Sequence, residues 1–206
     1  MYTFLLVLHI VFGVSALCAA GMALFSVKGD RRHINAGLAF VAAMLVISTT
    51  AATMTLLKQN LFLLSVALFS FYLVGSGWLH ARNHQQAPLM AEWIMAIGMI
   101  ITGIVMALAG LQWLWSNDSM GIVLILFGGI GSVLAITDIL LFRNPQHYAN
   151  ARIKTHLTKM LGGTIAVLTA VSVVNISIEP KFIVWITPTL IITPVIIYYR
   201  AAYAKI

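Results

Sequence analysis

Four ionisable side chains lie at the ends of long apolar stretches: His33, His80, Asp138 and His156. Three imidazoles and a carboxylate are a sufficient ligand set for zinc or another divalent metal. Two facing histidines, His33 and His156, could instead hold a b-type haem from both sides. Ionisable groups inside a membrane are costly, so we expect these residues to converge in a single polar site.

The neighbouring sequence supports the haem interpretation and also allows two others. Three glycines lie one to two turns deeper on the spans of His33 and His156, where a flat macrocycle needs room: Gly37, Gly162 and Gly163. A simpler interpretation is that the histidines are interfacial polar residues and that Asp138 pairs with Arg143 or Lys154. A proton relay through the same groups is a third interpretation.

A second set of polar residues is expected in the outer half of the bundle, away from the His/Asp site. His9 and Asn175, with threonines of the second span, could line an outer pocket for a quinone head group or a transported solute. Such residues also commonly hydrogen-bond neighbouring helices, contributing about 0.6 kcal/mol each.

His80 and His84 form a His-x-x-x-His pair, which is the spacing found in zinc hydrolases of the ceramidase kind. In those proteins the pair lies in the last span, whereas the last span here has no histidine.

The composition indicates which class of fold positions these residues. Of 206 residues, 61% are hydrophobic and 8% are charged, whereas soluble domains average about 45–50% apolar and about 25% charged residues. This excludes an ordinary soluble fold, a disordered chain and a nucleic-acid-binding module, despite the net charge of +7. The single cysteine, Cys18, cannot form an internal disulfide. The chain is therefore predicted to be a multi-pass membrane protein in a lipid bilayer.

Seven stretches are long enough to cross the bilayer, which needs roughly 20 apolar residues per helix. We expect an all-α bundle of seven helices that forms one transmembrane domain over residues 1–206. The predicted spans are Thr3–Val27, Ile34–Leu57, Leu61–Leu79, Glu92–Trp115, Met120–Phe142, His156–Ile176 and Phe182–Tyr199.

The basic residues predict the orientation of the bundle, because Lys and Arg concentrate on the cytoplasmic side. Ten fall on one side: Lys28, Arg31, Arg32, Arg82, Arg143, Arg152, Lys154, Lys159, Arg200 and Lys205. Only Lys58 and Lys181 fall on the other. We therefore expect the N-terminus outside and the C-terminus in the cytosol, in the inner (plasma) membrane of a bacterial cell. The outer connections are short, so nothing large can be recognised from outside.

An internal repeat is a further expectation. The second and sixth predicted spans both begin with histidine, His33 and His156, after a basic loop, and both contain glycines within two turns. Each is followed by a short connection and another span. A 3+1+3 arrangement of parallel repeats fits this pattern.

Several segments resemble an uncharacterised bacterial family of seven-helix integral membrane proteins, a predicted membrane domain of unknown function. They are His9-Ile10 with Gly13, Lys28-Gly29 with His33 and Gly37, Phe62-Leu63-Leu64 with Phe69–Val74, Thr137-Asp138, His156–Gly162, Thr169-Ala170 with Asn175, Pro188-Thr189-Leu190 and Thr193-Pro194. The resemblance implies a fold and a membrane location. It implies no activity.

Three classes of function are compatible with these residues. The first is a haem- or metal-binding membrane protein with a redox role at the His/Asp site, which we expect near the cytosolic face. The second is a small-solute or proton-coupled transporter or channel, with a path from His9 to Asp138. The third is an accessory subunit without chemistry of its own, in a homo-oligomer or a larger membrane complex. Whether the chain is an enzyme is left open.

Overall fold

The computed structural model describes residues 1–85 and 87–202. This part of the chain folds into seven α-helices: α1 (Tyr2–Phe25), α2 (Arg31–Leu57), α3 (Leu61–Arg82), α4 (Met90–Trp115), α5 (Gly121–Phe142), α6 (Pro145–Asn175) and α7 (Phe182–Ala202). Each of the seven is long and apolar enough to cross a membrane. The prediction of an all-helical, multi-pass membrane protein is thereby confirmed. Lys205, counted above for the orientation, lies outside the described residues.

Three of the helices begin where a capping side chain accepts a hydrogen bond from a free backbone N–H group of the first turn. The Asp30 side chain accepts a hydrogen bond from the His33 backbone N–H (2.7 Å), and the Asn60 side chain accepts one from Leu63 N–H (3.0 Å). The Asn144 side chain accepts one from the backbone N–H of His147 (3.1 Å). These residues start α2, α3 and α6.

Helix α6 differs most from its predicted bounds, because it begins at Pro145 and not at His156. The Asn144 cap followed by proline at the first helical position is a common helix start. Hydropathy missed these first turns because they carry polar side chains, among them Tyr148 and Arg152. Helix α3 also continues past the predicted end at Leu79, to Arg82.

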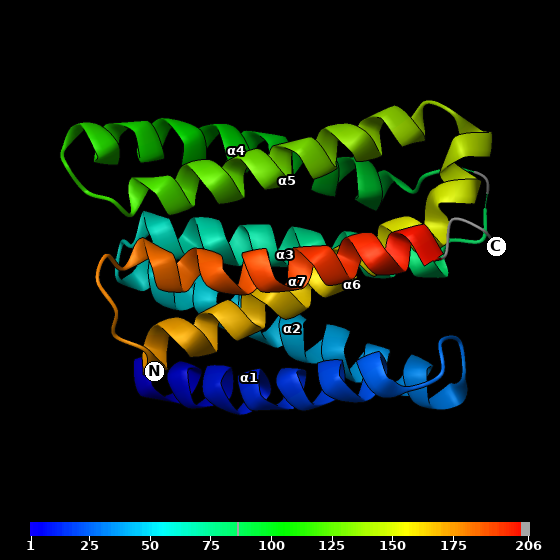
Figure 1. Ribbon diagram of the computed structural model, residues 1–206, viewed down its shortest axis with the longest axis horizontal. Coiled ribbons are helices and arrows are strands. Elements are labelled where there is room, and N and C mark those ends of the chain that lie inside the picture. The colour runs from blue at the N-terminus through cyan, green and yellow to red at the C-terminus, as the bar shows by residue number, and fades with distance from the viewer. Residues whose placement is uncertain (86, 203–206) are drawn as a thin grey trace.

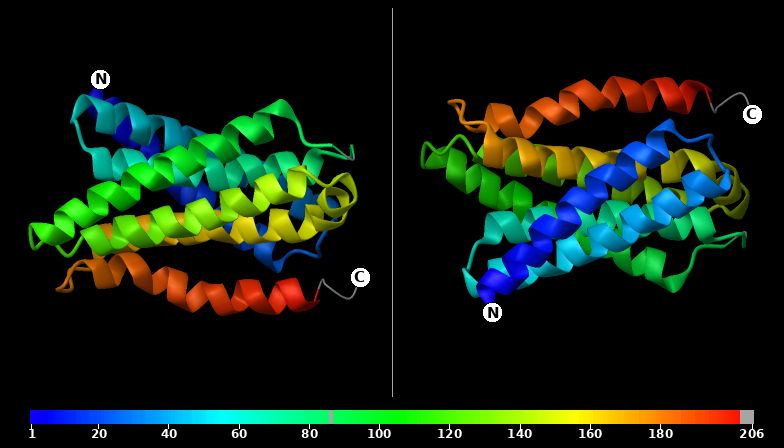
Figure 2. Two further views of the ribbon diagram at one scale, coloured as in Figure 1. Left: turned by 90° about the horizontal axis from the view of Figure 1, so that it is seen from above. Right: turned by 90° about the horizontal axis from the view of Figure 1, so that it is seen from below.

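The helices are arranged as two hairpins on either side of a central pair. Figure 1 shows α1 and α2 along one side and α4 and α5 along the other, with α3 and α6 between them. Helix α7 lies against α6 at the edge of the bundle (Figure 2). The two ends of the described chain lie at opposite ends of the bundle, as an odd number of spans requires. The direction of the bundle in the membrane and the 3+1+3 repeat stay predictions.

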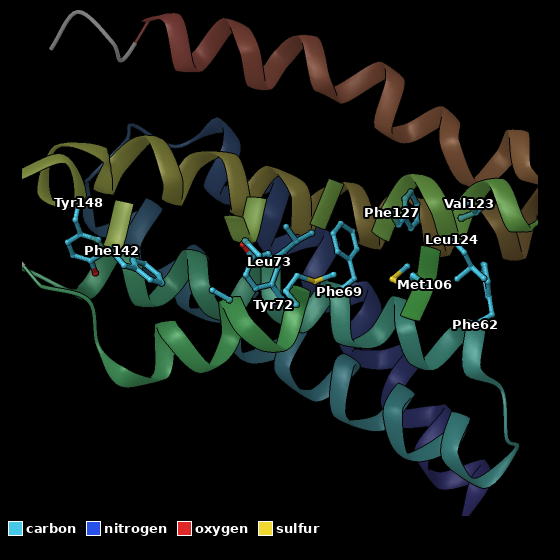
Figure 3. Packing of buried hydrophobic residues seen from close by; sticks show 13 residues of the cluster. Phe62, Phe69, Tyr72, Leu73, Met106, Val123, Leu124, Phe127, Phe142 and Tyr148 are labelled. Carbon is cyan, nitrogen blue, oxygen red and sulfur yellow. The ribbon is translucent and has the colours of Figure 1, made fainter. Parts of the chain in front are cut away.

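The core lies where α3 meets the α4–α5 hairpin. Figure 3 shows Phe69, Met106, Leu124 and Phe127 packed together in this region. The outer face of α1, in contrast, exposes large apolar side chains such as Phe4, whose surface is 67% exposed. An apolar outer face of this kind suits contact with a lipid bilayer.

Candidate functional site: a buried ionisable seam between α3 and α6

Two facing rows of polar side chains line the contact between α3 and α6, and we call them together the α3–α6 seam. On α3 the row consists of Tyr72, Ser76 and His80, which lie four residues apart and are all buried. Residues at this spacing share one face of a helix. The row on α6 consists of Tyr148, Arg152, His156 and Lys159. The two rows meet through side-chain and backbone contacts along roughly two turns of α3.

The first cluster of the seam lies at the middle of α3. It is an ion pair between Asp138 of α5 and Lys159 of α6. The Tyr72 hydroxyl of α3 donates a hydrogen bond to Asp138 Oδ2 (2.8 Å), the oxygen that Lys159 Nζ also contacts. The ammonium lies 4.8 Å from the centre of the Tyr72 ring, a cation–π distance. Tyr72 is near the middle of α3, roughly 16 Å from either helix end at 1.5 Å per residue. Three helices are therefore tied together at the middle of α3 and close to the end of α5.

This pairing differs from the sequence-based interpretation of both residues. Asp138 was expected beside Arg143 or Lys154, and Lys159 was counted as a basic residue of a cytoplasmic connection. Because α6 begins at Pro145, Lys159 falls well inside the helix and only 1% of its surface is exposed. Because the Lys159 charge is paired with Asp138 inside the bundle, it does not indicate which side of the membrane is cytoplasmic.

The second cluster of the seam lies at the end of α3. His80 Nδ1 lies 2.9 Å from Glu92 Oε1 of α4. The Tyr148 hydroxyl is 2.8 Å from both Glu92 oxygens. Asn83 Nδ2 donates to Glu92 Oε2 (3.1 Å) and to the Tyr148 hydroxyl (2.7 Å). Figure 3 shows Tyr148 beside Phe142 at one end of the core, with Tyr72 further along.

The imidazole of His80 has one unused nitrogen. Its side chain is fully buried, and Nδ1 faces Glu92 while Nε2 is without a hydrogen-bond partner among the described residues. The rings of Tyr148 and Phe142 pack around it, with centroids 5.2 and 6.0 Å away. Glu92 is an acceptor when ionised, so it favours the proton on Nδ1 and leaves a lone pair on Nε2. That lone pair is able to take a proton or bind a cation.

His33 and His156 occupy different surroundings from Asp138. His156 Nδ1 lies 3.0 Å from the Gly77 carbonyl oxygen of α3, and His33 Nδ1 lies 3.0 Å from the Ala23 carbonyl oxygen of α1. No hydrogen bond or ion pair joins any two of the four described residues His33, His80, Asp138 and His156. Over residues 1–85 and 87–202, no three His, Cys, Asp or Glu side chains form a group that could hold a metal ion.

The three glycines expected to leave room for a macrocycle differ from one another. A Cβ placed on Gly37 meets nothing within 4 Å. A Cβ on Gly162 meets Leu73 at 3.3 Å, and one on Gly163 meets Val74 at 2.6 Å and Phe40 at 3.4 Å. Gly162 and Gly163 therefore serve close packing of α6 against α3, and open space remains only beside Gly37.

The remaining candidates lie apart from the seam. His9 Nδ1 lies 3.1 Å from Thr50 Oγ1 and joins α1 to α2. The Asn175 amide is exposed and donates to the Val171 carbonyl within its own helix (2.8 Å), so the hydrogen bonds of His9 and Asn175 go to different partners. The His80–His84 spacing does not place two rings on one helix face, because α3 ends at Arg82. His84 Nδ1 instead contacts Arg152 (2.8 Å).

Sequence reasoning missed most members of the seam. Glu92 was noted only as the start of a span, and Tyr72 and Tyr148 were not considered. A signal was present, because Tyr72, Ser76 and His80 recur every four residues within an apolar helix. Such a stripe indicates a polar helix contact. The α6 row recurs at similar spacing, whereas Glu92 on α4 and Asp138 on α5 are single residues without such a pattern.

The fold and the seam together define a multi-pass, all-helical membrane protein with ionisable side chains buried between its helices. No family model, curated protein or solved structure matches this chain. The functional argument therefore depends on the geometry of the seam.

Proposed function

We propose that the protein couples proton movement to its activity in the membrane, as a proton-coupled transporter in which the α3–α6 seam binds and passes the proton. One observation carries the proposal. Four ionisable side chains are almost completely buried: His80 and Glu92 are 0% exposed, Lys159 is 1% and Asp138 is 2%. They lie around one helix, α3, from its middle to its end.

The energetic cost of such groups supports a functional role. A buried ion pair is often no more stabilising than well-packed apolar residues of similar volume. Ionisable groups in membrane spans commonly mark ion pathways and proton relays. Two separate ionisable pairs around one helix are more than helix packing requires.

The chemistry of the pairs also suits proton transfer. Transfer of a proton from Lys159 Nζ to Asp138 neutralises both groups without changing the net charge of the bundle, and the Tyr72 hydroxyl adjoins the same carboxylate oxygen. At the end of α3, His80 Nε2 has no hydrogen-bond partner among the described residues and can accept a proton, while Nδ1 of the same ring lies 2.9 Å from Glu92 Oε1. The Ser76 hydroxyl lies between the two clusters on the same helix face. Tyr72 and His80 are about 12 Å apart along α3.

Proton flux into liposomes tests this proposal. The purified protein is reconstituted with a pH-sensitive dye inside, and a potassium diffusion potential drives proton entry. We expect flux above that of protein-free liposomes, and its loss in Glu92→Gln and in Asp138→Asn. Glu179→Gln, at an exposed position in the α6–α7 connection, is the matched control and keeps the flux. Wild-type flux equal to protein-free liposomes, or full flux in both buried variants, contradicts the proposal.

Haem binding by His33 and His156 is a second candidate function. Each histidine has Nδ1 at 3.0 Å from a backbone carbonyl, the contact that commonly orients a metal-ligating imidazole and leaves Nε2 for the metal. His33→Ala or His156→Ala should abolish the Soret band of protein purified from haem-replete cells. Asp138→Asn should leave it, since Asp138 contacts Lys159 and Tyr72. A colourless wild-type protein contradicts this candidate.

A further inference from the structure

A pocket of about 400 Å³ lies where α3 ends and the chain turns toward α4. It is lined by Trp78, Leu79, Arg82, Asn83, His84, Gln85 and Leu89. Its volume is within the usual range of small-ligand sites, roughly 300–1,000 Å³. None of these seven described residues is acidic. Glu92, which accepts from the lining residue Asn83, is already engaged by His80 and Tyr148.

The polar groups around this pocket are predominantly donors. The Arg82 guanidinium lies 5.2 Å from the centre of the Trp78 ring, and stacking on a ring leaves its N–H edge free to bind an anion. The ion pairs found among the described residues include neither Arg82 nor Arg152. The Trp78 indole Nε1 is buried, and no described residue accepts its hydrogen bond.

His84 also presents a donor, for a reason that follows from Arg152. An arginine can only donate, so the Arg152 NH1 at 2.8 Å from His84 Nδ1 requires a lone pair on that nitrogen. The proton of neutral His84 is then on Nε2. Arg152 NH1 also reaches the Ala81 carbonyl oxygen (3.2 Å), which holds its positive charge at the end of α3.

We infer that this pocket binds a phosphate group, which offers acceptor oxygens and negative charge to these donors. The surroundings favour a phosphate carried by an anionic lipid. The pocket lies at the end of a membrane-spanning helix, and its apolar members Leu79 and Leu89 adjoin the polar ones. Basic pockets at the ends of membrane helices commonly take lipid head groups. A soluble phosphate monoester has the same binding chemistry without the acyl chains.

The test measures binding to the full chain in a neutral detergent, by native mass spectrometry and by the shift in thermal unfolding temperature. The probes are phosphatidylglycerol, phosphatidylcholine, glycerol phosphate and inorganic phosphate. We expect one phosphatidylglycerol to be retained per chain, and Arg82→Gln to bind it about tenfold more weakly through loss of a charge-assisted contact. Trp78→Phe, which keeps an aromatic ring but removes the indole N–H, should weaken binding by a smaller factor.

Arg31→Gln is the matched control, since Arg31 is an exposed arginine on α2 outside the pocket lining. Retention of phosphatidylglycerol but not of glycerol phosphate supports a lipid as the source of the phosphate. Equal binding of both supports a soluble phosphate. Failure of every phosphate probe to bind, equal binding of phosphatidylcholine, or equal losses in Arg82→Gln and Arg31→Gln would overturn the inference.

Discussion

Lys159 of α6 and Asp138 of α5 form an ion pair that is almost fully buried, and the Tyr72 hydroxyl of α3 donates to the same carboxylate oxygen. This contact joins three helices at one point. Because neither charge reaches water, each depends on the other for compensation.

Lys159→Met should therefore destabilise the protein strongly, by about 3–5 kcal/mol, because it leaves Asp138 charged and without its cation. The double variant Asp138→Asn with Lys159→Met should recover most of this loss, since no uncompensated charge remains. Denaturant unfolding in detergent measures both. Equal losses for the single and double variants would show that the loss does not come from an uncompensated charge on Asp138.

Tyr148→Phe should cost about 1–3 kcal/mol of stability, the usual penalty when a buried hydrogen-bonding group loses a partner. The missing hydroxyl contacts both Glu92 oxygens and accepts from Asn83. Tyr198→Phe, whose ring is 70% exposed on α7, is the control and should change little. Thermal unfolding of the two variants side by side checks the difference.

Gly77→Ala should separate α3 from α6. A Cβ at Gly77 would lie 2.9 Å from both Lys159 Cβ and Met160 Cε, closer than carbon atoms pack. Overpacking of this kind typically costs about 1–3 kcal/mol. Gly37→Ala, where a Cβ meets nothing within 4 Å, should be neutral or stabilising by up to about 1 kcal/mol through better helix propensity. A stable Gly77→Ala variant would mean that the two helices have room to shift.

Reporter fusions test the orientation predicted from the basic residues. Fusions after residues 30, 86 and 150 should read as cytoplasmic, and fusions after residues 59, 117 and 179 as external. With Lys159 removed from the count because it is buried and paired, nine basic residues still oppose two. An inverted pattern at any pair of consecutive connections would contradict the assignment.

The sequence predicted the helices far better than the site. Apolar length alone located all seven spans, because lipid leaves the backbone no alternative to helices. The failures lie where polar residues begin or end a helix, as at Pro145 and Arg82. Among the site residues, His80 and Asp138 were identified because ionisable side chains are rare in such a chain. Their partners Glu92 and Lys159 were read as interfacial, because the depth of a residue depends on where its helix starts.

The pairing of Asp138 with Lys159 also bears on how the chain enters the membrane. The two residues lie on consecutive helices, separated by 21 positions. Asp138 lies about one turn from the end of α5, and an unpaired charge there adds to the cost of inserting α5 alone, although by less than the roughly 2.5–3.5 kcal/mol of a charge at a helix centre. Helices α5 and α6 should therefore leave the translocon as a hairpin. Tyr72, already placed on α3, then offers its hydroxyl to the arriving carboxylate.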